Sequence, residues 1–427
     1  MKRTLTIILT LILTISLIGL FGCGKKEPLD ADNPVTLTMW HNFGGEMQKT
    51  MDELIDEFNS TIGREKGIII NVTAISSSAE LQEKLDMIAN GDPGAPEMPD
   101  IFTAYPKTAI RFQADDKLVN FDDYFDGAEL ANYVDAFVKE GRFNDGLYVF
   151  PFAKSTEVLF LNRTLFDQFA KESDVTFSQM STLEGIMDAA DKYYKWSGGK
   201  TFFTADSWLN VMQSAVKQQG GELFKGHRID TSGKSYRKTF NLLKDTVKKG
   251  GIAVYDGYSS DLSKTGDIIC STGSSAGILF YGDRVTYNDN TTIKVEYNIL
   301  PYPVVKGGEK IAIQRGNGLC VAKSDESKEY AACVFLKWFT EPGQNMRFIS
   351  STGYLPVTKK AFENEMGAEI EKTEDGRIKM MLETSLKMYD NYQFYTAPVF
   401  DGVDQISATF EKNIKAEFKK LTRSADW

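Results

Sequence analysis

Residues 35–46 read VTLTMWHNFGGE, and the succession of elements that starts here decides the fold. The first six residues alternate with a period of two, which is typical of a half-buried strand. Gly44 and Gly45 then interrupt the pattern. The following apolar residues recur at the spacing of one helix face, which predicts an amphipathic helix: Met47, Met51, Leu54, Ile55 and Phe58.

Two more strands continue this succession. The β-branched stretch 68–72 (IIINV) predicts a second strand, a helix is expected over 78–89, and 101–104 (IFTA) predicts a third strand. Such a β-α-β-α-β order implies a parallel sheet with helices on its faces. Ligands of these sheets bind beyond the carboxyl ends of the strands. We therefore expect Trp40-His41-Asn42 and Ala104-Tyr105-Pro106 at the binding edge.

The rest of the chain predicts more α/β structure. Residues 158–162 (VLFLN) indicate a buried strand, and 266–280 indicate another strand followed by a turn rich in serine and glycine. No internal repeat is found. Helices are expected near 164–171, 181–195, 205–219, 234–249, 331–339, 373–390 and 403–423.

The N-terminus predicts a secretory signal. Lys2 and Arg3 precede a mostly apolar run, and the small residue Gly22 stands directly before Cys23, an order typical of a lipoprotein signal. We expect 1–22 to be removed, and 23–33 to form a lipidated cysteine and a flexible tether, so that acyl chains on Cys23 anchor the protein to the membrane. The alternative is an uncleaved membrane helix with an incidental cysteine, since Phe21 is bulky for a processing site.

Composition excludes several classes of protein. The chain has 427 residues and a net charge of −10, and loss of Lys2 and Arg3 leaves 47 basic and 59 acidic residues, or −12. Nucleic-acid binding depends on Lys and Arg neutralising phosphates, so no nucleic-acid partner is expected. With histidine only at 41 and 227 and no CxxC motif, neither a metal site nor a cofactor is predicted. The remaining cysteines lie in apolar stretches and are expected to be buried free thiols: Cys270, Cys320 and Cys333.

Several separated stretches resemble one family, the extracellular solute-binding proteins of ABC sugar importers, in the group that contains maltose-binding and glycerol-3-phosphate-binding proteins. They follow one another in the order that this family has, through nearly the whole mature chain. The stretches are VTLTMWHNFGGE at 35–46, FPFAKSTEVLFLNR at 150–163, TADSW at 204–208, TGSSAG at 272–277 and TGYLPVT at 352–358.

The resemblance implies a periplasmic-binding-protein-like fold, in which two α/β lobes are joined by crossover hinge segments and a ligand binds in the cleft. Crossovers are expected near 153–159, 308–316 and 355–362. Lobe one would hold 34–155 and 314–360, and lobe two 156–313 and 361–427. The implied function is capture of a sugar or oligosaccharide outside the cytoplasmic membrane by a lipid-anchored monomer, which delivers it to the membrane subunits of an ABC permease.

Aromatic faces cover the apolar C–H face of a sugar ring. Trp208 is the first candidate, because Ala205-Asp206-Ser207 reads as a cap that places the ring near a helix end. Its alternative is an ordinary helix-packing role, and Trp40 is equally compatible with a core position. The other candidate platforms are Tyr105, Tyr281, Tyr354 and Phe400.

Polar candidates surround the predicted crossovers and strand ends. His41 has a structural turn as its alternative, Glu157 an ion pair with Lys154, and Gly316 simple hinge flexibility. The predicted polar and backbone contacts are His41, Asn42, Ser155, Glu157, Ser274, Ser275 and Gly316.

The chain departs from the glycerol-3-phosphate branch in two places. Tyr105-Pro106 stands where that branch has a glutamate, and the stretch 397–401 (APVFD) lacks its phosphate-binding arginine. A guanidinium fork is the strongest partner for a phosphate. We therefore expect a neutral sugar or oligosaccharide, with glycerol-3-phosphate or its diesters as the alternative.

An enzyme is not expected. Residues 273–277 (GSSAG) match the G-x-S-x-G elbow of α/β-hydrolases, but that fold needs its histidine after the serine, and His41 and His227 both precede Ser275. No spacing of carboxylates indicates a glycosidase. A lipoprotein that binds without transport stays open, because permease docking has no sequence motif.

Overall fold

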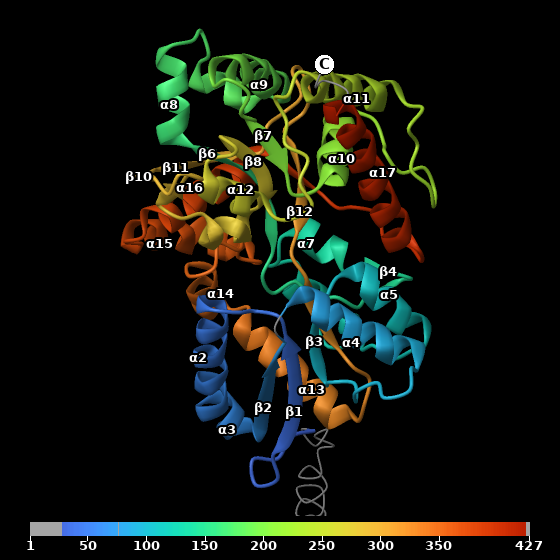
Figure 1. The fold of residues 1–427 in the computed structure, drawn as a ribbon. Helices are drawn as coiled ribbons and strands as arrows, with labels where there is room; N and C mark the ends of the chain where they lie inside the picture. Colours follow the sequence, from blue (N-terminus) through green and yellow to red (C-terminus); the bar gives the residue numbers. More distant parts are fainter. Residues whose placement is uncertain (1–27, 76, 424–427) are drawn as a thin grey trace, which may run out of the picture.

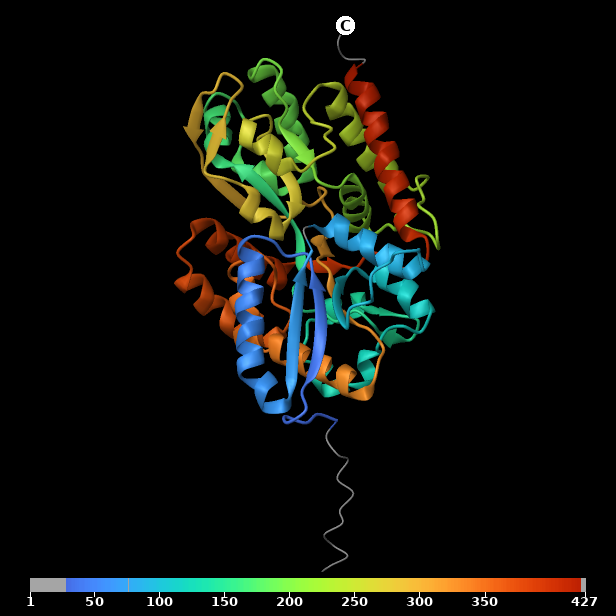
Figure 2. The same ribbon diagram turned by 60° about the horizontal axis from the view of Figure 1, so that its bottom comes forward.

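The computed structural model describes residues 28–75 and 77–423, so the predicted signal peptide and Cys23 lie outside the described residues. Two α/β lobes lie one above the other (Figures 1 and 2). Each lobe has its own sheet, and the chain passes between them several times. The predicted two-lobed α/β fold is confirmed.

The sheet of the first lobe has the strand order β13-β3-β1-β2. Strand β1 pairs in parallel with both β2 and β3, as the β-α-β-α-β pattern predicted, and β13 adds an antiparallel edge. The strands are β1 (Val35–His41), β2 (Ile68–Ala74), β3 (Ile101–Ala104) and β13 (Gly318–Val321). The helices of this lobe include α2 (Glu46–Ser60), α3 (Ile62–Lys66), α4 (Ser78–Asn90), α5 (Pro106–Ala114), α6 (Gly127–Leu130), α7 (Asp135–Glu140), α13 (Glu326–Phe339) and α14 (Pro342–Ile349).

The sheet of the second lobe has the order β14-β12-β6-β8-β7, with β11 also beside β6. The first two residues of β6 pair with β12, and from Val158 onward β6 pairs with β11. Strand β6 therefore starts at the junction of the lobes and ends inside the second one. The strands are β6 (Ser155–Asn162), β7 (Phe203–Ala205), β8 (Cys270–Ser274), β11 (Tyr297–Pro301), β12 (Ile311–Arg315) and β14 (Gln393–Tyr395).

Helices cover the second sheet close to where periodicity placed them. The helix predicted over 205–219 begins later, at Trp208, because the Ser207 side chain accepts the N–H of Asn210 and so caps it. The helices are α8 (Arg163–Lys171), α9 (Leu183–Trp196), α10 (Trp208–Gln218), α11 (Lys234–Lys248), α12 (Ser259–Thr265), α15 (Met366–Lys372), α16 (Gly376–Asn391) and α17 (Val403–Arg423). Short pieces complete the fold: β4 (Arg142–Phe143), β5 (Gly146–Leu147), β9 (Arg284–Thr286), β10 (Thr292–Lys294) and the helical turns η1 (Phe121–Asp123), η2 (Phe177–Ser181), η3 (Ser275–Phe280) and η4 (Ala361–Glu365).

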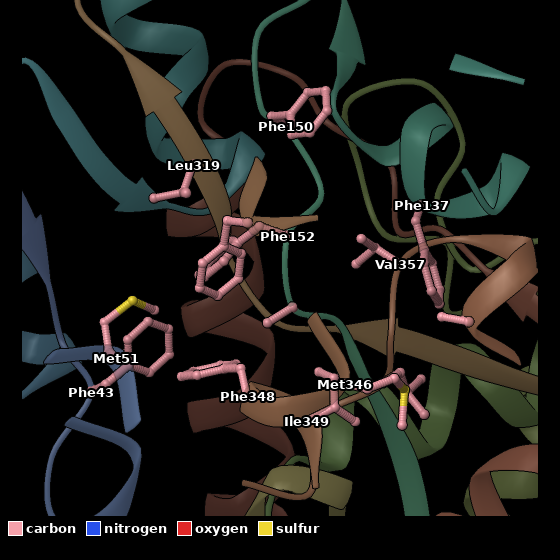
Figure 3. Close-up of a cluster of buried hydrophobic side chains, with 14 of the residues drawn as sticks. Phe43, Met51, Phe137, Phe150, Phe152, Leu319, Met346, Phe348, Ile349 and Val357 are labelled. Atoms are coloured by element: carbon pink, nitrogen blue, oxygen red, sulfur yellow. The ribbon is translucent and has the colours of Figure 1, made fainter. Parts of the chain in front are cut away.

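One apolar core runs through both lobes. Figure 3 shows part of it, where Phe43 faces Phe152 and Phe348 at ring-centroid distances of 5.8 and 5.1 Å. The same cluster includes Phe160 of β6 and Ile299 of β11 in the second lobe. A second cluster fills the far side of the second sheet, and a third lies under α4 and α5.

Lys154 joins the three predicted crossover segments at one point. Its backbone exchanges two hydrogen bonds with Leu355, and its ammonium donates to the Gly316 carbonyl at 2.5 Å. The ammonium also pairs with Glu140 at 2.5 Å, and the Lys154 side chain is 2 % exposed. Gly316 lies at φ +88° with the backbone of 153–155 close above it, so only glycine fits without strain.

The three described cysteines are buried free thiols, as predicted. Burial raises the pKa of each thiol, so none carries reactive thiolate at neutral pH. Among the described residues no helix combines the length and the apolar character that crossing a bilayer requires.

Candidate ligand-binding site

A cavity of about 370 Å³ lies where the two lobes face each other. The first lobe contributes the start of α5, and the second lobe contributes the starts of α10 and α17. Strand β12 and the segment 397–399 also line the cavity. The lining residues are Tyr105, Pro106, Lys107, Glu140, Ser207, Leu209, Asn210, Gln213, Phe224, Ile313, Gln314, Arg315, Ala397, Pro398, Val399, Val403, Asp404 and Ser407.

The start of α10 reaches this cavity with its backbone donors already in use. Glu411 of α17 accepts the N–H groups of Trp208 and Leu209 at 3.1 and 2.8 Å, and Ser207 accepts that of Asn210 at 3.2 Å. The backbone N–H groups of a helix's first turn have no partner within the helix, and a helix start binds anions through them when they are free. Because a carboxylate of the chain already occupies them, the start of α10 offers no site for a second anion.

An ion pair borders the cavity through Arg315, one of the lining residues. Arg315 donates to Glu157 at 3.0 Å, and the Asn210 amide donates to the same oxygen at 2.7 Å. Glu157 is wholly buried, whereas the Arg315 side chain is 31 % exposed. Burial raises the pKa of the Glu157 carboxyl, and the charge of Arg315 and the Asn210 hydrogen bond oppose that rise. The second Glu157 oxygen has no hydrogen-bond partner among the described residues.

Two glutamines extend the polar wall. Gln213 donates to Asn210 at 2.9 Å, and Gln314 donates to Glu140 at 2.8 Å. The amide oxygen of each glutamine is buried and has no partner in the described part of the chain. Unmet acceptors of this kind suit a ligand that carries hydroxyl donors.

A salt bridge spans the cavity between the lobes. Lys107, in the first turn of α5, pairs with Asp404, in the first turn of α17. Both side chains are about half exposed, and both line the cavity. Figures 1 and 2 show the start of the red helix α17 next to the cyan elements of the first lobe, where this contact is made.

The predicted site residues do not all meet at the cavity. Tyr105 lines the cavity directly. Ser155 accepts from Ser274 at 3.1 Å, and Ser275 accepts the Thr156 N–H at 3.4 Å, so these serines join β6 to β8 and η3.

Asn42 crosslinks the strand ends of the first lobe. Its amide donates to Ser78 at 2.6 Å, and its oxygen accepts from Thr103 and Asn317 at 3.1 and 3.0 Å. Gly316 follows β12 next to Arg315, and Tyr354 packs beside Phe43. None of these residues lines the cavity of about 370 Å³, although Gly316 directly follows Arg315, which does.

Four predicted contacts lie elsewhere. Trp208 is wholly buried between Phe203 and Phe418, so the structure gives it the helix-packing role that was its alternative. His41 is also wholly buried, with Nδ1 accepting the Phe43 N–H at 3.2 Å, which is the structural turn role. Trp40 packs against the core under α4 and α5. Phe400 is buried against the ring of His227, at 4.6 Å, rather than facing the cavity.

Lys154 and Glu157 do not pair with each other. Lys154 binds Glu140, and Glu157 binds Arg315. Residues three apart in an extended chain point to opposite faces, so the two side chains diverge.

Sequence reasoning missed part of the cavity. A signal was available for Asn210 and Gln213, because both follow the Ser207 cap on one face of α10, three residues apart. No sequence signal joins Lys107 to Asp404 or places Phe224 in the wall, since these contacts connect residues that are far apart in the chain.

The chain is similar to known proteins over most of its length. The model of the bacterial extracellular solute-binding protein family matches residues 53–375. The sn-glycerol-3-phosphate-binding periplasmic protein UgpB of Salmonella typhimurium is 25 % identical over 350 residues, which cover 77 % of this chain and 75 % of that protein. UgpB of Pectobacterium atrosepticum is 24 % identical over 349 residues, or 77 % and 74 % of the two chains.

Solved structures share the fold. The cyclic alpha-maltosyl-1,6-maltose binding protein of Arthrobacter globiformis superimposes with a TM-score of 0.74 at 17 % identity, covering 92 % of this chain and 97 % of that one. UgpB of Mycobacterium tuberculosis, in complex with glycerophosphocholine, gives a TM-score of 0.70 at 18 % identity, with coverages of 92 % and 98 %.

Proposed function

Because this chain belongs to the bacterial extracellular solute-binding proteins, the solute-binding components of ABC importers, we propose that its cleft captures a neutral sugar or oligosaccharide. The family consists of transport proteins rather than enzymes, and we propose that the chain binds its solute without catalysis.

The observation that carries this proposal is the internal balance of charge around the cavity. Arg315 is paired with Glu157, Lys107 with Asp404, and Glu140 with Lys154. A ligand with a net charge would compete with these pairs, whereas a neutral polyol meets donors and acceptors without disturbing them. Glu411 at the start of α10 supports the same conclusion, because it occupies the backbone donors that a phosphate would use.

The shape and lining of the cavity suit a sugar. Its volume of about 370 Å³ lies at the lower end of small-molecule sites. Aliphatic and proline side chains such as Val399, Val403 and Pro106 offer apolar contacts for C–H groups. Arg315, Asn210 and Gln213 offer polar contacts for hydroxyls.

Glycerol-3-phosphate or a glycerophosphodiester is the second candidate. The curated relatives bind glycerol-3-phosphate, and the side chain of Arg315 lines the cavity and is partly exposed. A phosphate at Arg315 would lie close to the carboxylate of Glu157, and like charges at that distance repel. This repulsion makes the neutral ligand the first choice.

We also propose how capture is coupled to transport. A ligand that contacts both lobes binds the closed arrangement more tightly than the open one. The ratio of these two affinities sets how far the ligand shifts the equilibrium towards closure. We place the lobe boundaries at 34–155 with 314–360 and at 156–313 with 361–427.

We further propose that a lipid on Cys23 holds the monomer at the outer face of the cytoplasmic membrane, beside its permease. Cys23→Ala should release it from the membrane fraction.

A thermal-shift screen of the purified mature chain tests the ligand class. Mono- and oligosaccharides are compared with glycerol-3-phosphate and glycerophosphocholine, and a ligand of the folded state raises stability with its free concentration. Stabilisation by a sugar supports the proposal, and stabilisation by the phosphorylated compounds alone would refute it. Slow loss of the stabilising sugar during incubation would indicate catalysis.

A further inference from the structure

The cavity has an aromatic wall that comes from a hairpin of the second lobe. Among the residues that the structure describes, Tyr105 and Phe224 are the aromatic side chains that line it. Phe224 also lines a neighbouring cavity of about 860 Å³, which shares the segment 397–399 with the first. Phe224 therefore lies at the boundary of the two spaces.

The hairpin that carries Phe224 is held in a fixed shape. The Lys225 N–H donates to the Arg228 carbonyl at 2.9 Å, and the Asp230 N–H donates to the Leu223 carbonyl at 2.8 Å. The side chains of Lys225 and Asp230 form an ion pair across it. These contacts fix the position at which the Phe224 ring leaves the hairpin.

Two more rings support Phe224 from behind. The edge of Phe400 contacts it at 6.1 Å and 71°, and His227 stacks on Phe400 at 4.6 Å and 4°. Phe400 is buried, whereas Phe224 is half-buried. An aromatic ring that is packed on one side and borders a polar cavity on the other has the arrangement of a preorganised stacking platform.

We propose that Phe224 is a specificity-determining residue of the cleft, whose ring stacks on the apolar face of the bound sugar. Phe400 and His227 act as positioning residues behind it. This inference rests on the proposed function and names the residue that supplies the stacking face from the second lobe. Tyr105 lies in the wall of the first lobe, so the two rings would bring both lobes into contact with one ligand.

Isothermal titration of the purified mature chain with maltose, maltotriose, ribitol and glycerophosphocholine tests the proposal. Phe224→Ala should weaken sugar binding by about tenfold or more, and Phe224→Leu, which keeps apolar bulk but no ring face, by about two- to tenfold. Phe224→Tyr keeps the ring face and should stay within about twofold of the wild type. Thermal unfolding of each variant checks that it is folded.

Phe177→Ala is the matched control. Phe177 is a half-buried ring of the same lobe, and its edge contact with Phe166, at 6.2 Å and 71°, copies the geometry of the Phe224 contact. It lies outside the cavity, so its loss should leave sugar affinity unchanged.

The outcomes separate the two proposals. Weaker binding by Phe224→Ala and Phe224→Leu, with normal binding by Phe224→Tyr and Phe177→Ala, supports the stacking role. Sugar binding that is unaffected in Phe224→Leu overturns that role and leaves the proposed function in place. A wild type that binds glycerophosphocholine and no sugar overturns both.

Discussion

Acidification is expected to destabilise this protein through one histidine. His41 ends β1, is wholly buried, and accepts the Phe43 N–H at 3.2 Å, while its Nε2 has no partner among the described residues. Burial lowers the pKa of His41 from 6.5 to about 4, because a charged imidazole would lose its hydration there. The folded state therefore favours neutral His41.

The sign and size of the effect follow from this pKa. The folded pKa lies below the unfolded one, so the stability from neutral His41 is complete above pH 6.5 and is lost as the pH falls towards 4. Neutral His41 contributes about 3 kcal/mol in all to the free energy of unfolding, and about 2.5 kcal/mol of this contribution is lost between pH 8 and pH 4.5.

Urea unfolding of the wild type and of His41→Gln over this pH range measures the effect. The carboxylates titrate alike in both proteins, so the difference between the two curves isolates His41. Its pKa can also be read directly by NMR on a protein without a histidine tag, because the chain has only two histidines, His41 and His227. A His41 resonance that titrates near 6.5, or equal pH slopes for the two proteins, would refute the reasoning.

Four further substitutions test other parts of the structure. Lys107→Gln removes the salt bridge with Asp404 and should weaken ligand binding by up to about fivefold in titration calorimetry, since exposed ion pairs contribute up to about 1 kcal/mol. The loss should be smaller in high salt, and equal losses at all salt concentrations would contradict this. Lys154→Met should lower the free energy of unfolding by about 3–5 kcal/mol, because it leaves a partly buried carboxylate unpaired. Gly316→Ala should cost about 1–2 kcal/mol in urea unfolding, because φ is +88°; an unchanged midpoint would argue against the tight crossing. Trp208→Ala should lower stability by about 3–5 kcal/mol while the affinity of the folded fraction stays unchanged, and a selective loss of affinity would restore its ligand role.

The sequence predicted the first lobe well because local pattern and global fold agree there. The alternating strand at 35–40 and the helix behind Gly44-Gly45 form β1 and α2, and β1 pairs in parallel with β2, the next strand in the chain. Sequential βαβ units leave few alternative topologies. The same edge of the sheet carries Tyr105, which does line the cavity.

The details of the site depended on information that periodicity does not contain. Helix α10 is buried on nearly all sides, so apolar periodicity alone does not tell which of its faces borders the cavity: Trp208 is buried in the core, and Asn210 and Gln213 line the cavity. Lys154 lies near Glu157 in sequence, but the alternation of side chains along an extended chain sends the two apart. Contacts such as Lys107 with Asp404 require the assembled fold.

The apolar core that runs through both lobes has a consequence for how the molecule unfolds. Because Phe43, Phe348 and Phe160 belong to one cluster, neither lobe can lose its packing without exposing part of the other. We therefore expect both lobes to melt in a single cooperative transition, in which calorimetric and van't Hoff enthalpies agree. A solute held in the cleft would then protect the whole chain, so that resistance to proteolysis far from the cleft would also report its capture.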